Sequence, residues 1–588
     1  MSLRRMFRDE LTYLRLQGRE FARHNPQLAR FLGEQAADPD VERLLEGFAF
    51  LTAKLRLKIE DDFEELTHSL LQLLWPNYLR PIPSMTIVRF DPIDRAITER
   101  QTIPQGSMLA SVPVDGVTCQ FRTCSDLQIY PLRINAVRDS HTREKSVVSI
   151  DLQTLSDQNL DAIDCDQLDL HLSGDDYTAL TLYLWTARYL DEVRIVVGDE
   201  VRKLNPAHIG FPGFQPEEAL LPYPRNVFDG YRILQEYFAF PRRYYFIRLN
   251  RLRSIWPAAT GQAVRLEFVY SRPMPADIKV RTSDIALHCV PAVNLFSHDA
   301  EPVSLDGQAS DYPVLPSGGL PHAYEVFSVD RVTGWEVKSA ARPGGLTREY
   351  HDFNSFQHEI ERSQGRNALY YRTRVEKKAT DDGLRHRIAF VRGDETQYIG
   401  KRETISADLT CTNRDLPVVL SAGDIRIPTQ GIPSYVTFTS LMQPTEPYRP
   451  VLDGSLHWTL ISNLSLNYLS LLGTEPLKAV IRAYDFAALH DIQSERNSRK
   501  RLEGIRDAKT LPINTLIKGL PVRGLKTVLD LDQEAFLCEG EVYLFGTVLS
   551  HFFGLYASIN SFHLLEVKNL TNNETYSWPL QRGNQPVI

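Results

Sequence analysis

Oxygen-bearing side chains recur at alternate positions in one segment of the N-terminal half, with the spacing of a calcium-binding loop. Asp157, Asn159 and Asp161 match the first three ligand positions of such a loop. Ala162 then stands where the sharp turn requires glycine, and Leu168 stands where a bidentate glutamate is required. We therefore interpret the segment as a solvated acidic loop and expect no metal ion there.

Thiol and imidazole groups are too dispersed to complete a metal site. Of the six cysteines, Cys119 and Cys124 are close enough to suggest a pair, but no second pair completes a set of four ligands. His351 and His358 lie seven residues apart without a third ligand. Sparse cysteines are typical of a reducing compartment, where they serve as small buried side chains. The sequence predicts neither a metal nor a cofactor.

Aromatic and basic residues alternate in one segment that could stack nucleic-acid bases. Tyr244, Tyr245 and Phe246 precede Arg248 and Arg251, but the segment lacks the glycines of an RNA-recognition strand. The formal net charge of −8 argues against a broad phosphate-binding surface. We interpret the segment as a buried strand with arginines at its ends, and we expect no nucleic-acid partner.

The motifs of common enzyme classes are missing from the sequence. No glycine-rich phosphate loop, nucleophile elbow or zinc-protease motif occurs. Carboxylate pairs such as Asp61 with Asp62, or Asp175 with Asp176, are adjacent, so their side chains diverge on a helix or strand. We therefore predict that the protein is not an enzyme. The alternative is a β-rich carbohydrate-active enzyme or glycan-binding protein, which requires two carboxylates about 5–10 Å apart in a cleft.

The sequence predicts neither a secretory signal nor a membrane span. The basic segment from Met1 to Arg8 is not followed by an apolar run. The most apolar stretch, Leu456 to Leu472, contains His457, Asn463 and Asn467 and is too short and polar to cross a bilayer. We expect a cytoplasmic protein that reaches a membrane only indirectly, through its partners.

The N-terminal region is predicted to be helical. Pro39 marks a helix start and Pro76 an end, and between them apolar residues recur at helical spacing along one face. This row consists of Val41, Leu44, Leu45, Phe48, Leu51, Leu55, Ile59, Phe63, Leu66, Leu70 and Leu73.

A second apolar face on this helix suggests a partner. Phe50, Ala53 and Leu57 project roughly opposite the main row, and a helix that is apolar on two faces is usually enclosed between neighbours. Those neighbours are either other chains or the β-rich part of the same chain, and the pattern favours neither. We take these three residues as candidate partner-binding residues.

From Pro81 onward, short β-branched and aromatic runs separated by glycine and proline predict strands. Examples are Met85 to Phe90, Leu180 to Trp185, Val193 to Val197 and Val264 to Tyr270. We expect an α+β chain with a helical segment at 1–80, β-rich domains at 81–272 and 273–484, and a mixed α+β C-terminal domain at 485–588.

The C-terminal domain contains a second helical row, rich in aromatic residues. Candidate self-association residues on it are Phe545, Leu549, Phe552, Phe553 and Tyr556. The alternative is a core helix packed under a hairpin formed by residues 562–567 and 574–578, and we expect both to be partly true. Elsewhere, Asn413 and Asp415 could contact a partner, but we favour an Asx-turn before a proline.

Several stretches in a fixed order resemble one protein family, and LQEYFAFP, YEVFSVDRVTG and LTCTNRDLP are among them. The matching stretches are Asp38–Met85, Leu234–Pro241, His288–Asp306, Tyr324–Gly334, Leu409–Pro417, Trp458–Leu471 and Gly540–Phe562. Together they resemble the TssF family of type VI secretion baseplate proteins, also called ImpG or VasA. That family is similar to a wedge protein of the phage T4 baseplate.

This resemblance implies a structural role without cofactor or catalytic residue. It implies that two TssF copies pair with one TssG, and that this wedge binds TssK and TssE around the spike hub. It also implies that the N-terminal helices join an intermolecular bundle and that C-terminal parts contact a second TssF copy. Such a platform supports the tail tube and contractile sheath at the cytosolic face of the inner membrane.

Overall fold

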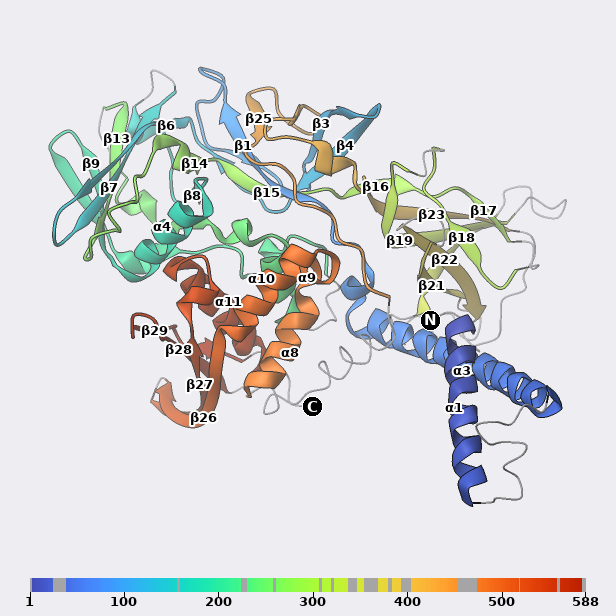
Figure 1. Cartoon of the computed structure of the whole chain (residues 1–588). Helices are drawn as coiled ribbons and strands as arrows, with labels where there is room; N and C mark the ends of the chain where they lie inside the picture. Colours follow the sequence, from blue (N-terminus) through green and yellow to red (C-terminus); the bar gives the residue numbers. More distant parts are fainter. Residues whose placement is uncertain are drawn as a thin grey trace. The chain divides into compact units, whose positions relative to one another are not determined.

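The computed structural model describes most of the chain, and its residues fall into two compact units (Figure 1). One unit is built on Met1–Leu74, and the other contains Trp75–Val451 together with Ser465–Ile588. The described residues are 3–24, 39–155, 159–223, 230–256, 261–305, 309–318, 322–336, 346–353, 369–378, 383–392, 403–452, 473–517, 519–557 and 561–583. Within these ranges, the side chains of Leu57 and Tyr556 lie outside the described part.

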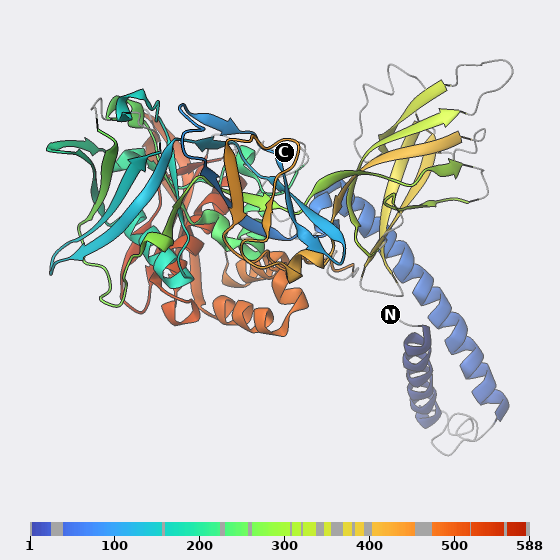
Figure 2. The same cartoon turned by 90° about the horizontal axis from the view of Figure 1, so that it is seen from above.

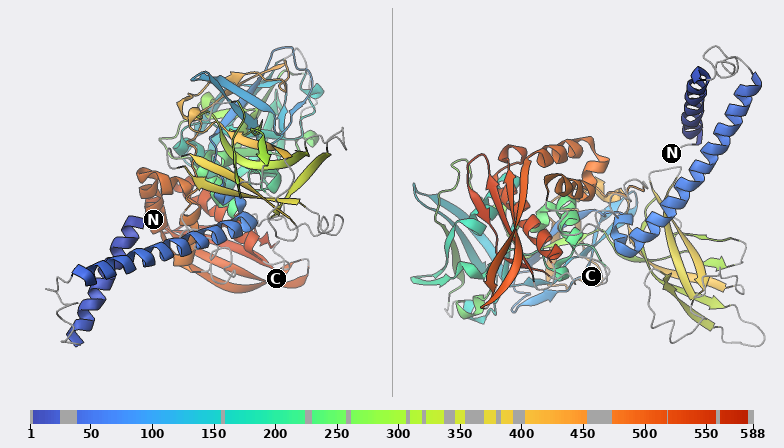
Figure 3. Two further views of the ribbon diagram at one scale, coloured as in Figure 1. Left: turned by 90° about the vertical axis from the view of Figure 1, so that its right-hand side faces the viewer. Right: turned by 90° about the horizontal axis from the view of Figure 1, so that it is seen from below.

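The first unit contains two helices, α1 (Leu3–His24) and α3 (Pro39–Leu74), which lie side by side (Figures 2 and 3). Arg15 of α1 donates to Glu42 of α3 at 2.8 Å. Asp40 and Glu42 occupy the first turn of α3, where negative charge stabilises the helix dipole. The long helix expected from the apolar row is confirmed.

The second unit contains a sheet whose strands come from distant parts of the chain. Its order is β24-β3-β4-β15-β1-β25. The strands are β1 (Met85–Pro92), β3 (Met108–Val114), β4 (Val117–Thr123), β15 (Cys289–Val293), β24 (Ile425–Ile427) and β25 (Val436–Ser440). Their inward side chains, which include Phe90, Phe121 and Phe438, form one hydrophobic core. The expected boundary between residues 272 and 273 therefore passes between strands that share a sheet.

Two smaller sheets are formed mainly by residues 132–287. One has the order β10-β9-β13-β7-β6 and the other β11-β12-β8-β14. The first contains β6 (Leu132–His141), β7 (Ser146–Thr154), β9 (Leu190–Val197), β10 (Glu200–Leu204) and β13 (Ala263–Tyr270). The second contains β8 (Leu168–Leu172), β11 (Ile209–Gly210), β12 (Phe246–Leu249) and β14 (Ile285–Leu287).

One predicted strand in this region is wrong, because Leu180 to Trp185 belongs to helix α4 (Asp176–Arg188). The carboxylate of Asp175 caps this helix by accepting from the amide of Thr178 at 3.0 Å. The residues from Leu180 to Trp185 are all buried, so the run has no polar face. A short apolar run that is buried on all sides does not distinguish a helix from a strand by periodicity.

Residues 296–412 form a sheet of their own, with the order β16-β23-β19-β20-β21-β22-β18 and β17 paired to β23. The strands are β16 (Phe296–Asp299), β17 (Val303–Leu305), β18 (Tyr312–Val314), β19 (Glu325–Glu336), β20 (Leu346–Asp352), β21 (Leu369–Lys377), β22 (Leu384–Arg392) and β23 (Glu403–Thr412). Its core includes Tyr350, Tyr371, Phe390 and Ile405.

The C-terminal part combines helices with a sheet of order β26-β27-β28-β29, in which β30 also pairs with β28. Helices α8 (Thr474–Tyr484), α9 (Phe486–His490) and α10 (Ile492–Glu503) precede the long strands β26 (Ile505–Ile517) and β27 (Leu520–Leu531). Helix α11 (Glu539–Tyr556) is followed by β28 (Phe562–Asn569), β29 (Thr575–Ser577) and β30 (Gln581–Arg582). The expected closing hairpin is confirmed, since β28 pairs antiparallel with β29.

Helix α11 packs closely against its neighbours because it carries glycine at the contact points. It contacts α4, α5 (Gly230–Ala239) and β28. A Cβ atom at Gly540 would overlap the backbone of Leu180, and one at Gly546 would overlap the ring of Trp578. None of the described helices is both long and apolar enough to cross a membrane.

Candidate functional site

Large apolar side chains are exposed along the N-terminal helices. On α3, Leu44, Phe48 and Leu51 are 73%, 61% and 60% exposed. Their spacing of four and three residues places them on one stripe of the helix. These residues belong to the row that dominates the sequence pattern, so this row is open to solvent in its first half.

The second face of α3 is only partly exposed. Phe50 is 45% exposed, whereas Ala53 is fully buried, and the side chain of Leu57 lies outside the described part of the structure. Helix α1 adds exposed apolar side chains of its own, which are Tyr13, Leu16 and Phe21. The helical hairpin therefore offers apolar surface on both helices, and Ala53 is not part of that surface.

The aromatic row of α11 lies in the core of the second unit. Phe545, Leu549, Phe552 and Phe553 are all buried, and the side chain of Tyr556 is outside the described part. The ring of Phe545 lies 5.9 Å from that of Tyr237, and Phe553 lies 4.9 Å from His563. The interpretation as a core helix is confirmed, and the prediction that these four side chains form a self-association surface is wrong. The helix is apolar because its own chain encloses it.

Asn413 connects separate parts of the fold instead of closing a local turn. Its side-chain oxygen accepts from the backbone amide of Gln120 at 2.9 Å and from the side-chain amide of Asn294 at 2.8 Å. Its backbone amide donates to the side-chain oxygen of Asn294 at 2.7 Å. Asp415 accepts from Arg449 at 2.8 Å. The favoured Asx-turn is therefore wrong, because long-range partners take these side-chain oxygens.

The acidic loop of the N-terminal half is engaged with arginines. Asp164 pairs with Arg253 at 2.6 Å, and Asp169 pairs with Arg248 at 2.8 Å. Asp157 lies outside the described residues, as does His358. Among the described residues, no group of three or more His, Cys, Asp or Glu side chains could hold a metal ion.

All six cysteines are buried free thiols, as the sequence predicts for small core side chains. Burial raises the pKa of Cys119 to about 11 and that of Cys124 to about 12. A thiol with such a pKa is protonated near neutral pH and is a poor nucleophile and metal ligand.

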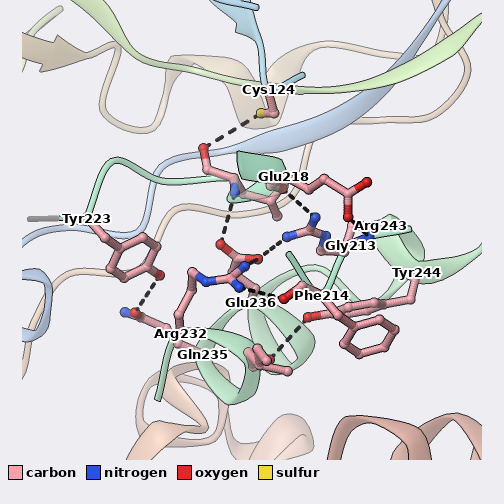
Figure 4. A network of polar contacts seen from close by, with 12 residues as sticks. Cys124, Gly213, Phe214, Glu218, Tyr223, Arg232, Gln235, Glu236, Arg243 and Tyr244 are labelled. Carbon is pink, nitrogen blue, oxygen red and sulfur yellow. Dashed lines mark hydrogen bonds and ion pairs between the residues drawn. The ribbon is translucent and has the colours of Figure 1, made fainter. Parts of the chain in front are cut away.

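Helix α5 carries the centre of a buried ion network, shown in Figure 4. The carboxylate of Glu236 accepts from Arg232, one helical turn earlier, at 3.5 Å, and also from Arg243. Its other oxygen accepts from the amide of Leu220 at 2.9 Å. All three charged side chains are almost completely buried, so each charge depends on the others for compensation.

The arginines of this network bind the loop that precedes α5. Arg232 donates to the carbonyl of Phe214 at 2.9 Å, and Arg243 donates to the carbonyl of Glu218 at 2.6 Å. The carboxylate of Glu218 accepts from Arg248 at 2.8 Å and from the amide of Gly213 at 2.6 Å. Through these bonds the network fixes the loop from residue 213 to 220.

The sequence contained a partial signal for this network. Arg232 and Glu236 are four residues apart, a spacing that brings opposite charges together on a helix, although the sequence pattern predicted no helix there. Part of the aromatic segment interpreted as a buried strand forms β12 (Phe246–Leu249), but Arg243 lies before it, in the 3-10 helix Pro241–Tyr244. Nothing local indicates that Arg243 turns back to Glu236, so the network as a whole was missed.

Three histidines are buried in neutral form. Burial lowers the pKa values of His171, His288 and His563 to about 3. Nε2 of His288 accepts from the amide of Tyr130 at 3.2 Å, which requires the tautomer protonated at Nδ1. Protonation would remove this acceptor and place a charge in the core.

We expect the protein to lose stability as the pH falls below about 6.5. In the unfolded chain these histidines titrate near the ordinary value of about 6.5, so between that pH and about 3 the unfolded state binds more protons. Each histidine then lowers the free energy of unfolding by roughly 1.4 kcal/mol per pH unit, so three histidines lower it by about 4 kcal/mol at pH 5.5. Urea unfolding midpoints at pH 7.5 and 5.5 measure this loss, and equal midpoints would contradict it.

The glycan-binding alternative requires a cavity with two free carboxylates. One cavity of about 590 Å³ is lined by Asp485, Glu541 and Arg501 among others. Glu541 pairs with Arg501 at 2.7 Å, and Asp485 caps α9 through the amide of Ala488 at 3.2 Å. The third carboxylate of the lining, Asp176, pairs with Arg242 at 3.0 Å. All three acids are engaged in structural contacts, so the cavity does not support a pair of catalytic carboxylates.

An exposed apolar helical hairpin on a large β-rich chain is a feature expected of a protein that works in an assembly. Comparison with known proteins defines the family. Residues 1–585 match the family described as "Type VI secretion system, TssF". The chain therefore belongs to the TssF family of type VI secretion baseplate components, as the resemblance in its sequence indicated.

Relatives match over almost the entire length. The chain is 28% identical over 630 aligned positions to the type VI secretion system component TssF1 of Pseudomonas aeruginosa, covering 99% of both chains. It is similar to a chain in the TssK-TssF-TssG baseplate subcomplex, with 30% identity, a TM-score of 0.74, and coverage of 93% of this chain and all of that one. A chain of the type VI baseplate complex matches with 27% identity and a TM-score of 0.61, covering both fully.

Proposed function

We propose that this protein is a non-catalytic structural subunit of a baseplate wedge and that it assembles with TssG and TssK. Its family membership and the baseplate complexes that contain similar chains support the proposal. The observation that carries it is the apolar hairpin, where Leu44, Phe48 and Leu51 project into solvent.

An exposed apolar stripe of this kind is costly unless another chain covers it. Burying one large apolar side chain contributes roughly 1.5–3 kcal/mol, so three in a row provide a substantial part of an interface. Apolar residues one turn apart are the anchors of helices that dock into grooves or bundles. We propose that TssG covers this stripe, and that α1 and α3 contribute to an intermolecular bundle.

Further parts of the proposal rest on the family alone. They are a stoichiometry of two copies per TssG, contacts with TssE and the spike hub, contact between TssF copies, and a position at the cytosolic face of the inner membrane. Because the aromatic row of α11 is buried, contact between copies would have to use other residues of the C-terminal part.

Co-expression tests the proposal directly. We expect the tagged full-length protein to retain TssG and TssK through affinity and size-exclusion chromatography, as a single complex whose mass is measured by light scattering. A tagged protein that elutes alone, with TssG and TssK present and folded in the same lysate, would contradict the proposal.

A further inference from the structure

A second cavity, of about 760 Å³, lies beside the loop that the ion network holds. Trp75, Arg122 and residues between Pro216 and Tyr223 line it. Its volume falls in the usual range for ligand-binding pockets, about 300–1,000 Å³. The cavity belongs entirely to the second unit.

Arg122 supplies a positive charge that lacks a close partner. It lies at the end of β4, is half-buried, and forms no hydrogen bond or ion pair through its side chain with any described residue. Asp330 attracts it only from beyond ion-pair distance, and this carboxylate accepts instead from Ser328 and Thr410 at 2.6 Å each. A partly desolvated guanidinium in this situation favours an incoming anion.

Trp75 supplies an aromatic part of the cavity wall. Its side chain is 1% exposed, and its indole Nε1 is enclosed by protein atoms, so this nitrogen does not face the cavity. The ring lies 5.4 Å from that of Tyr223, which also lines the cavity, so the two rings together provide an apolar surface.

Another part of the cavity lining is apolar and fixed in place. Leu220, Leu221 and Pro222 form it, and Leu220 is held through its amide by Glu236 and through its carbonyl by the thiol of Cys124 at 3.7 Å (Figure 4). A wall that is already ordered loses little entropy when a ligand binds. By fixing the loop, the ion network therefore also fixes part of the cavity wall.

We propose that the cavity receives an acidic segment of a partner protein, with a carboxylate on Arg122 and an adjacent apolar side chain against Trp75 and Tyr223. The guanidinium of Arg122 selects an anionic group, and the apolar walls select a side chain next to it. The inference rests on the proposed function, because a protein that works in an assembly is expected to place partner segments in such cavities.

Photo-crosslinking in the full complex tests the inference. A benzophenone amino acid replaces Glu217, an exposed residue that lines the cavity, in the full-length protein co-expressed with TssG and TssK. We expect a crosslink to a segment of a partner that contains Asp or Glu. Arg122→Gln should lower the crosslink yield at least about tenfold, and Arg122→Lys should restore part of it because it keeps the charge.

The controls separate the two proposals. Arg426→Gln, at an exposed arginine of the same sheet, should leave the crosslink yield unchanged. A complex that forms normally, but in which the probe reaches only its own chain, a second copy or a segment without carboxylates, overturns the inference and leaves the proposed function intact. An Arg122→Gln variant that folds and crosslinks like the unmodified protein also overturns it. Loss of the whole complex in the unmodified protein contradicts the proposed function instead.

Discussion

Replacing Phe48 and Leu51 together by aspartate should prevent TssG from co-purifying with the full-length protein, while the protein itself stays folded. Both side chains are about three-fifths exposed, so the isolated fold gains little from them. In the proposed interface they would become buried, and losing them would cost about 2–4 kcal/mol. This corresponds to a roughly 30- to 1,000-fold increase in Kd, which titration calorimetry or surface plasmon resonance measures.

A matched control uses α10, in the second unit. Gln493 and Asn497 are exposed polar residues of this helix, and replacing both by aspartate adds the same charge outside the helical hairpin. We expect this variant to bind TssG normally. Equal binding by both double variants would show that the stripe is not the interface, and unfolding of the Phe48 and Leu51 variant would show that its own chain needs the stripe.

Replacing Glu236 by glutamine should destabilise the second unit by about 3–5 kcal/mol. The change removes the one carboxylate shared by Arg232 and Arg243, and two buried guanidinium groups then lose their counter-charge. For a unit of this size the shift is roughly 1 °C per kcal/mol, so the melting temperature of this unit should fall by about 3–5 °C. Differential scanning calorimetry measures the shift.

The control for this variant lies in the same loop. Glu217 is exposed and forms no ion pair within the described part of the structure, so Glu217→Gln changes the net charge equally without breaking the network. We expect its melting temperature to stay within about 1 °C of the unmodified protein, because exposed charges contribute little to stability. If the two variants have the same melting temperature, the network does not stabilise the loop.

The sequence predicted those elements whose pattern is local. The long helix α3, the strands β1, β9 and β13, and the closing hairpin of β28 and β29 follow from apolar periodicity and turn residues. Strand pairing was beyond reach, because β1 pairs with β25 some 350 residues later in the chain. Residue spacing contains no information about which distant strand completes a sheet.

The two apolar helices explain why the candidate surfaces were only partly predicted. Both α3 and α11 show strong apolar rows, and periodicity alone does not reveal what covers them. In the fold, Phe545 and Phe552 are enclosed by α5 and its neighbours, whereas Phe48 stays exposed. Glycine was the overlooked signal, because Gly540 and Gly546 mark α11 as a helix packed closely by its own chain.

Hydrogen–deuterium exchange tests most directly whether the helical hairpin is an assembly surface. Exchange is compared for the full-length protein alone and in complex with TssG and TssK. An exposed two-helix unit opens easily, and a covered one does not. We predict that residues 7–21 and 41–54 exchange markedly more slowly in the complex. Unchanged exchange in both segments, within a complex that remains intact, would contradict the proposal that α1 and α3 bind a partner.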